Sequence, residues 1–280
     1  MDSVRRALAL GVLLVACTGV GLAGQDAATS ATARLAPAEM EAFLLKAPKV
    51  GGLRSTGKGV TDSKKGTLSD GRVTHAVHVQ DIDDKRAIFE AGAKTELNFK
   101  DWYGYNIAGY KLAQLIGLDK VPVPMSVERR LEDKPAAVTW WVDDVLMDEQ
   151  DRTKKGVQGP SPQRTVNQLA VMTVFDELIQ NKDRNQGNIL WTSDWTMWLI
   201  DHTRAFRTGK ELLKPAQLAR CERGLLERLR GLTAESLDQA VGRWLTKAEK
   251  DAVMARRDLI VKHFEARIAK LGEAAVLYTL

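Results

Sequence analysis

The segment that most constrains the fold of this 280-residue chain is 181–206, "NKDRNQGNILWTSDWTMWLIDHTRAF". It places Asp183 five residues before Asn188, and Asp201 thirteen residues after Asn188. The stretches 188–192 and 195–200 are predicted to form two short strands joined by a tight hairpin. Because a hairpin returns the chain to the same end of a sheet, we expect the three polar side chains to point into one cleft.

Two acids and an amide at this spacing suit the transfer of a phosphoryl group. That reaction needs a base to orient the attacking hydroxyl, and oxygen ligands that hold a metal ion against the phosphates. Asp183 is the candidate base, and Asn188 and Asp201 are the candidate ligands. Oxygen ligands of this kind suit Mg²⁺, or Mn²⁺ in its place. The structural alternative is that Asp183 and Asn188 are polar loop residues and that Asp201 caps a strand.

The pattern "D-R-N-Q-G-N … L-I-D-H-T-R-A-F" resembles the catalytic core of the protein-kinase-like fold. Asn181-Lys182-Asp183 stands where ordinary protein kinases have His-Arg-Asp, and Asp201-His202-Thr203 where they have Asp-Phe-Gly. The Asp-Arg and Asp-His pairs are similar to those of phosphatidylinositol kinases and secretory-pathway kinases. The resemblance implies an atypical kinase-like phosphotransferase of the α+β class, with ATP or another nucleotide as donor.

The first half of the chain is predicted to be rich in β-structure. A short helix is expected at 39–46, two or three antiparallel strands within 51–81, and strands at 121–127 and 136–142. Asp101 is predicted to cap a helix that Gly117 ends. The apolar face of that helix consists of Tyr105, Ala108, Leu112, Leu115 and Ile116.

The second half is predicted to be helical. An apolar face over 166–178 indicates a helix that leads into the opening segment. After Lys210 the pattern is nearly all helical, and Thr246 with Glu249 forms a capping box for the longest helix, which runs to about Lys270. The sequence therefore predicts a β-rich N-terminal lobe at 37–142 and a helical C-terminal lobe at 143–280.

The segment "STGKGVTDSKKGTL" is predicted to bind phosphate. Gly57 and Gly59 allow close backbone approach, and Lys58, Lys64 or Lys65 adds positive charge. A solvated hairpin turn is the alternative. The segment 52–58 also spells GxxxxGK, but a glycine follows where a P-loop needs serine or threonine, so that motif is rejected.

At the expected junction of the lobes, the backbone of Val142 is the candidate contact for an adenine-like ring.

Departures from the kinase pattern are consistent with the alternative that the protein is catalytically inactive. Related kinases hold the phosphates with a strand lysine paired to a helix acid, but the strand "THAVHVQ" has no lysine before Gln80, and Asn106 stands where the acid is expected. Glu96 with Lys85 or Lys94 is a possible replacement pair. The alternative is therefore a catalytically inactive pseudokinase that binds a nucleotide or another ligand.

The acceptor is not named by the sequence. No Ala-Pro-Glu motif follows Asp201, so the platform that kinases use for peptide substrates is not carried over. A protein, a lipid and a small molecule all remain possible acceptors.

Residues 1–24 are predicted to be an export signal, with Arg5 and Arg6 before an apolar run too short to span a bilayer as a helix. Leu14-Val15-Ala16-Cys17 resembles the bacterial lipobox, which implies lipidation of Cys17 and attachment to a membrane of the cell envelope or periplasm. Cleavage near Ala23 is the alternative. Residues 25–36 are then a linker. A donor other than ATP is possible, because ATP is scarce outside the cytoplasm.

Composition and residue placement argue against other classes of site. The formal net charge of +5 is small and dispersed, without a basic stripe, so nucleic-acid binding is not expected. His75 and His78 are predicted to lie on opposite faces of a strand, so no zinc site is assigned. The tryptophans at alternating strand positions are interpreted as packing residues. Lipidation of Cys17, or its removal by cleavage near Ala23, leaves only Cys221 as a free cysteine, so no internal disulfide is expected.

Overall fold

A computed structural model describes residues 35–57, 63–91 and 94–280. The predicted signal with Cys17 lies outside the described residues, as do Lys58, Gly59 and all of the predicted linker except residues 35 and 36. Residues 35–280 form one unit. The boundary between two lobes at 142 and 143 therefore stays a prediction.

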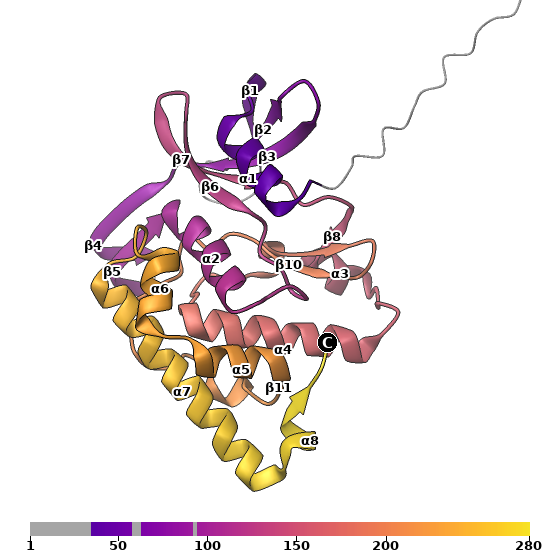
Figure 1. Ribbon diagram of the computed structural model, residues 1–280, viewed down its shortest axis with the longest axis vertical. Helices are drawn as coiled ribbons and strands as arrows, with labels where there is room; N and C mark the ends of the chain where they lie inside the picture. Colours follow the sequence, from indigo (N-terminus) through magenta and orange to yellow (C-terminus); the bar gives the residue numbers. More distant parts are fainter. Residues whose placement is uncertain (1–34, 58–62, 92–93) are drawn as a thin grey trace, which may run out of the picture. The chain divides into compact units, whose positions relative to one another are not determined.

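A five-stranded antiparallel sheet dominates the N-terminal part (Figure 1). Its strand order is β1-β2-β3-β7-β6. The bounds are β1 (Lys49–Ser55), β2 (Lys64–Ser69), β3 (Thr74–Gln80), β6 (Ser126–Leu131) and β7 (Lys134–Trp140). Three strands thus cover the segment predicted to contain two or three.

The predicted strand at 121–127 was misplaced, and β6 begins only at Ser126. Pro122 and Pro124 explain the difference, because proline has no N–H to donate to a neighbouring strand. The strand predicted at 136–142 is present as β7, which begins and ends two residues earlier.

The register of the sheet decides which side chains share a face. Val77 pairs with Trp140, and α1 (Pro37–Lys46) covers this face, where Phe43 meets the Trp140 ring edge to face with 5.8 Å between centroids. On the opposite face Ala137 packs against Ile107 of α2 (Gly104–Leu115). The sheet is therefore held between two helices, one on each face.

A second, two-stranded ribbon lies between β3 and α2 in the sequence and was not predicted. It consists of β4 (Asp83–Ala91) and β5 (Lys94–Trp102), which pair with each other and not with the main sheet. Ile88 and Leu97 pair across the ribbon and are 57% and 68% exposed. The apolar alternation that signals a half-buried strand is thus weak here.

Asp101 was predicted to cap α2, and this was wrong. It lies in β5, where pairing with Asp84 keeps its backbone extended, and the residue that precedes the helix is Tyr103.

Helices dominate the C-terminal part, as predicted. α4 (Pro162–Ile179) begins at Ser161, whose side chain accepts from the Arg164 N–H at 3.2 Å. α7 (Lys247–Leu271) begins with the predicted capping box of Thr246 and Glu249. The remaining helices are α3 (Glu149–Lys155), α5 (Arg223–Gly231), α6 (Ala234–Val241) and α8 (Glu273–Val276), with 3₁₀ turns at Gln186–Asn188 and Pro215–Gln217.

Two small sheets complete this part. β8 (Val145–Asp148), β9 (Ile189–Thr192) and β10 (Met197–Leu199) form an antiparallel sheet in the order β10-β9-β8, and β11 (Cys221–Glu222) pairs in parallel with β12 (Leu277–Tyr278). The predicted hairpin is therefore present with shorter strands. Asp194 closes its turn by accepting from the Thr196 N–H at 3.1 Å.

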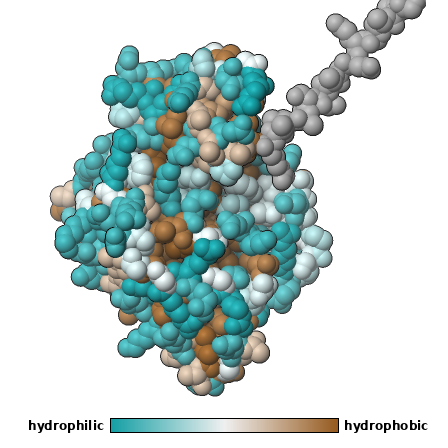
Figure 2. Space-filling model, viewed as in Figure 1, coloured by the Kyte–Doolittle hydropathy of each residue, from teal (hydrophilic) through white to brown (hydrophobic). Residues whose placement is uncertain are grey.

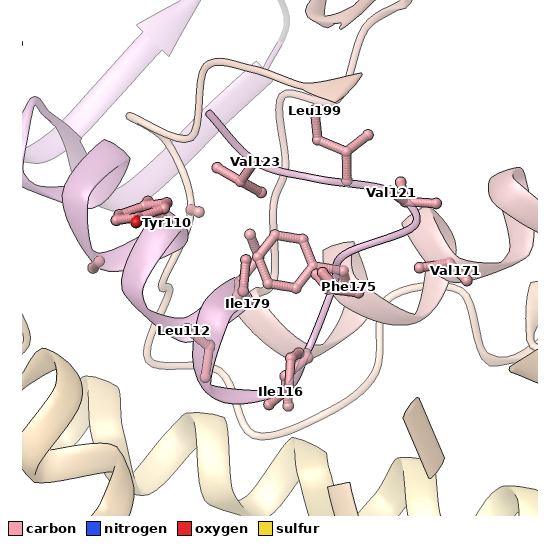
Figure 3. Close-up of a cluster of buried hydrophobic side chains, with 14 of the residues drawn as sticks. Tyr110, Leu112, Ile116, Val121, Val123, Val171, Phe175, Ile179 and Leu199 are labelled. Carbon is pink, nitrogen blue, oxygen red and sulfur yellow. The ribbon is translucent and has the colours of Figure 1, made fainter. Parts of the chain in front are cut away.

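Phe175 is the centre of the packing that positions α4 (Figure 3). It is fully buried, and Figure 3 shows Leu112 of α2, Ile116 just after that helix, Val123, and Leu199 of β10 around it. Helix α4 is thereby held against both α2 and the small sheet. The loop that follows α4 is consequently anchored to both halves of the fold.

Hydrophilic residues cover most of the face shown in Figure 2, with hydrophobic residues gathered in patches toward its middle. Within the described residues, none of the helices combines the length and the apolar character that crossing a bilayer requires.

Candidate active site

The loop that carries Asp183 starts where α4 ends. Gln180 takes a left-handed conformation with φ of 48°, and the Asn181 N–H donates to the Asp176 carbonyl at 2.9 Å. The Asn181 side chain then accepts from the Asp183 N–H at 3.0 Å. Asn181, which stands in place of a histidine, thus shapes the turn that presents Asp183.

Asp183, Asn188 and Asp201 come together through the backbone of the loop and the hairpin. The Asn188 side chain donates to the Asp183 carbonyl at 3.4 Å, and the Ile200 N–H donates to the Asn188 carbonyl at 3.1 Å. Asp201 follows Ile200 and is close enough to raise the pKa of Asp183. The three residues predicted from spacing alone are therefore neighbours, while their roles stay predictions.

Arg184 joins the two segments of the site. Its guanidinium pairs with the buried carboxylate of Asp176 at 3.0 Å and donates to the carbonyls of Asn188 and Ile200, both at 2.8 Å. It also lies 3.0 Å from Nε2 of His202. Burial and Arg184 hold the pKa of His202 well below its usual range, so the ring is neutral and Nε2 accepts. The Asp183-Arg184 and Asp201-His202 pairs of the sequence are therefore joined by the hydrogen bonds of Arg184.

Asp201 has a backbone conformation that is unusual for a residue with a side chain. Its φ is 55°, in the left-handed region. The Asp201 Oδ1 atom accepts from the Thr203 hydroxyl at 2.9 Å and faces the Thr203 N–H at 3.4 Å. This local turn compensates part of the strain and directs the carboxylate toward Thr203.

Asp183 combines partial exposure with a shifted pKa. Its side chain is 43% exposed, so a substrate can reach it. Burial raises the pKa of Asp183, Arg204 at 3.8 Å lowers it, and Asp201 raises it, with a net increase above the usual range of an aspartate. A raised pKa makes the carboxylate a stronger base than a free aspartate.

The sheet separates the two described lysines of the predicted phosphate-binding segment. Lys65 pairs with His78 and lies on the face that carries Thr139, with its Nζ atom 4.0 Å from the centre of the Trp141 ring. Lys64 lies on the opposite face and pairs with Asp81 at 3.4 Å. Successive residues of a strand point to opposite faces, so these two lysines cannot serve one ligand.

The other predicted nucleotide contacts lie at the ends of strands. Gly57 follows β1 and has a φ of 64°, a conformation that glycine adopts without strain. Val142 follows β7 and is buried, and the preceding Trp141 N–H donates to the Ala76 carbonyl at 3.3 Å. Their contacts with a nucleotide stay predictions.

No protein-family model and no curated protein sequence matches the chain. Solved structures do. The structure of hydra Fam20 with sugar matches with a TM-score of 0.63 and 16% identity, over 85% of this chain and 90% of that chain. The Golgi casein kinase matches with a TM-score of 0.61 and 14% identity, over 85% and 78%. The Helicobacter pylori proinflammatory kinase CtkA matches with a TM-score of 0.51 and 10% identity, over 81% and 97%.

The chain has an atypical protein-kinase-like fold. At these identities the likeness shows the fold alone.

Within this kinase-like fold, Gln80 and Asn106 do not replace the expected ion pair. The Gln80 side chain accepts from the Ile82 N–H at 3.3 Å, and the Asn106 side chain accepts from the His202 N–H at 2.7 Å. Both side-chain amides therefore accept hydrogen bonds from backbone N–H groups. Asn106 fixes α2 to the segment that carries Asp201.

The predicted pairing of Glu96 with Lys85 was wrong. Lys85 lies 2.8 Å from Asp83, and the register of the ribbon places it opposite Lys100, away from Glu96. Glu96 instead contacts Arg204 at 3.0 Å and Arg207 at 2.9 Å. The side chain of Lys94, the other predicted partner, lies outside the described residues.

The kinase-like site also contains His78, Asp101 and Arg204, which the sequence analysis did not assign. Burial lowers the pKa of His78 and the charge of Asp201 opposes that shift, so the His78 ring is close enough to Asp201 to sense its charge. The register of β2 and β3 places His78 opposite Lys65. Asp101 carries no local signal, because its proximity to this site depends on the ribbon.

The oxygen groups of this site suit a hard divalent cation. Asp201 and Asn188 offer one carboxylate and one amide, and Mg²⁺ is commonly held by one or two carboxylates together with water and substrate phosphates. In the described part of the chain, no three His, Cys, Asp or Glu side chains are arranged to hold a metal ion. A set of one carboxylate and one amide fits a cation that enters with a phosphate ligand.

Proposed function

We propose that this chain is an exported, kinase-like phosphotransferase that moves a phosphoryl or nucleotidyl group from a Mg²⁺-nucleotide to an acceptor. The observation that carries this proposal is the joint positioning of Asp183, Asn188 and Asp201 through Arg184. The shared fold of hydra Fam20, the Golgi casein kinase and CtkA supports the same class of reaction. A sugar and casein are named for two of those proteins, and at 16% and 14% identity neither is carried over as acceptor.

The roles of the residues follow from their chemistry. Asp183 accepts the proton of the acceptor hydroxyl and orients that group, while Asn188 and Asp201 provide oxygen ligands for Mg²⁺ or Mn²⁺. When bound, the cation neutralises charge on the phosphates of ATP or another donor. Arg184 holds the segments that carry Asn188 and Asp201 in place beside Asp183. Among the described residues we assign contacts with the phosphates to Gly57 and Lys65, and the contact with the base to Val142.

A thermal-shift experiment tests the proposal. We expect at least one nucleotide to raise the melting temperature of the full chain when Mg²⁺ or Mn²⁺ is present, and Asp201→Ala to abolish the metal-dependent part of that shift. The substitution removes the charged ligand, and ligands stabilise the folded state in proportion to their occupancy. If no nucleotide gives a metal-dependent shift in the parent protein, the nucleotide-dependent function is wrong.

Lys65 is expected to be the described lysine that binds phosphate. A charge-assisted contact contributes about 1.5–3 kcal/mol, so Lys65→Ala should weaken nucleotide binding roughly tenfold or more, measured by titration calorimetry. Lys64→Ala is the matched control, because it removes the same charge from the opposite face and should change the affinity little. An equal effect of both substitutions would argue against a specific phosphate contact at Lys65.

One observation favours the alternative of a nucleotide- or ligand-binding pseudokinase. Gln80 and Asn106 are neutral amides that bond to backbone groups, and as amides they supply no charge for phosphates. A pseudokinase would show the metal-dependent thermal shift described above without transfer to any acceptor. Activity assays on the same protein preparation separate the two functions.

Export and lipid anchoring are part of the proposal. If Cys17 is lipidated, Cys17→Ser should move the protein from the membrane fraction to the soluble fraction, because the acyl chains provide its strong hydrophobic attachment. Unchanged partitioning of this variant would contradict the anchor.

A further inference from the structure

Asp101 is a buried carboxylate beside the segment that carries Asp201. The ribbon brings it there, since the N–H of the next residue, Trp102, donates to the Thr203 carbonyl at 2.9 Å. Asp101 is 6% exposed, and within the described residues its Oδ1 atom is buried without a hydrogen-bond partner. Such an oxygen is unfavourable unless something else compensates it.

Thr203 cannot satisfy both carboxylates. Its hydroxyl donates to Oδ1 of Asp201 at 2.9 Å and is also the hydrogen-bonding group that faces Asp101. A hydroxyl has one hydrogen to donate, and an ionised carboxylate only accepts. One of the two carboxylates therefore lacks this donor whenever both are ionised.

The described charged groups around Asp101 do not supply the hydrogen bond that its Oδ1 atom lacks. Asp201 and Asp183 act on Asp101 as like charges, whereas Arg204 and Arg207 act on it as opposite charges. Arg204 is already 3.0 Å from Glu96 and 3.8 Å from Asp183. Arg204 and Arg207 are shared among Glu96, Asp183 and Asp101, with Asp201 as a fourth carboxylate nearby. A divalent cation is the group that changes this balance most.

We propose that Asp101 is a positioning residue for the divalent cation at Asp201 and accepts a hydrogen bond from a water bound to that cation. Contact through water, rather than direct ligation, is part of this inference. Mg²⁺ and Mn²⁺ retain water ligands in such sites, and carboxylates outside the ligand set orient them. This inference rests on the proposed function.

The experiment measures Mn²⁺ binding to the full chain by electron paramagnetic resonance, without nucleotide. Asp101→Asn keeps the shape of the side chain and removes its charge, and we expect it to weaken Mn²⁺ binding about 10–100-fold. Glu90→Gln is the matched control, because it removes one charge from an exposed position of the same ribbon. That variant should bind Mn²⁺ as the parent protein does.

A second measurement separates positioning from a structural role. In the presence of a chelator, Asp101→Asn should melt no lower than the parent protein, because it removes repulsion from an uncompensated carboxylate. Unchanged Mn²⁺ affinity would overturn the inference, and so would weaker binding accompanied by a lower melting temperature.

Asp201→Asn distinguishes this inference from the proposed function. If Asp201→Asn weakens Mn²⁺ binding and Asp101→Asn does not, the role of Asp101 alone is wrong. If neither substitution changes binding, or the parent protein binds no Mn²⁺, both the cation site and the role of Asp101 are wrong.

Discussion

Replacing Asp183 with asparagine is expected to lower the rate of group transfer about 10²–10⁴-fold, the range that a general base contributes. Asparagine cannot accept the proton of the acceptor hydroxyl, although it preserves the size of the side chain. The Asp183 N–H bond to Asn181 does not depend on the carboxylate, so the turn should persist. The measurement is the turnover of donor nucleotide together with its dissociation constant.

The dissociation constant should stay near that of the parent protein, because Asn188 and Asp201 are the predicted cation ligands. Asp258→Asn, which removes a 69% exposed carboxylate of α7, is the control for loss of charge. A variant at Asp183 that transfers as fast as the parent protein would exclude the base assignment.

Replacing Arg184 with methionine is expected to lower the free energy of unfolding by about 3–5 kcal/mol, the typical cost of leaving one member of a buried ion pair alone. The side chains of Arg184 and Asp176 are 8% and 13% exposed, and the guanidinium also satisfies the carbonyls of Asn188 and Ile200. Methionine fills much of the volume but donates no hydrogen bond. Urea denaturation of the two proteins measures the difference.

Lys182→Met is the matched control for this prediction. Lys182 lies in the same loop, two residues before Arg184. Its side chain is 41% exposed and contacts Glu96 at 3.8 Å, so its loss should lower the free energy of unfolding by less than about 1 kcal/mol. An Arg184 variant as stable as the Lys182 variant would show that the buried network contributes little. Nucleotide binding should weaken together with stability, because Arg184 connects the segments of Asn188 and Asp201.

Much of the fold could be predicted from local patterns. The capping box at Thr246 defined the start of α7, and the short apolar stretches around Ser193 defined the hairpin. The same patterns do not specify which strands pair with each other. The ribbon of β4 and β5 was missed because its apolar alternation is weak, as the exposed pair of Ile88 and Leu97 illustrates.

The sequence by itself determined that Asp183, Asn188 and Asp201 are neighbours, because a short loop and a tight hairpin allow few other arrangements. It also determined the capping box of Thr246 and Glu249 at the start of the longest helix, because those contacts are local in the chain. Only the tertiary structure decided that Lys65 shares its face with His78, that Glu96 pairs with Arg204 and Arg207, and that Asp101 lies beside Thr203. These contacts join residues far apart in the chain, and their selection depends on packing and charge compensation across the whole fold, which no local pattern records.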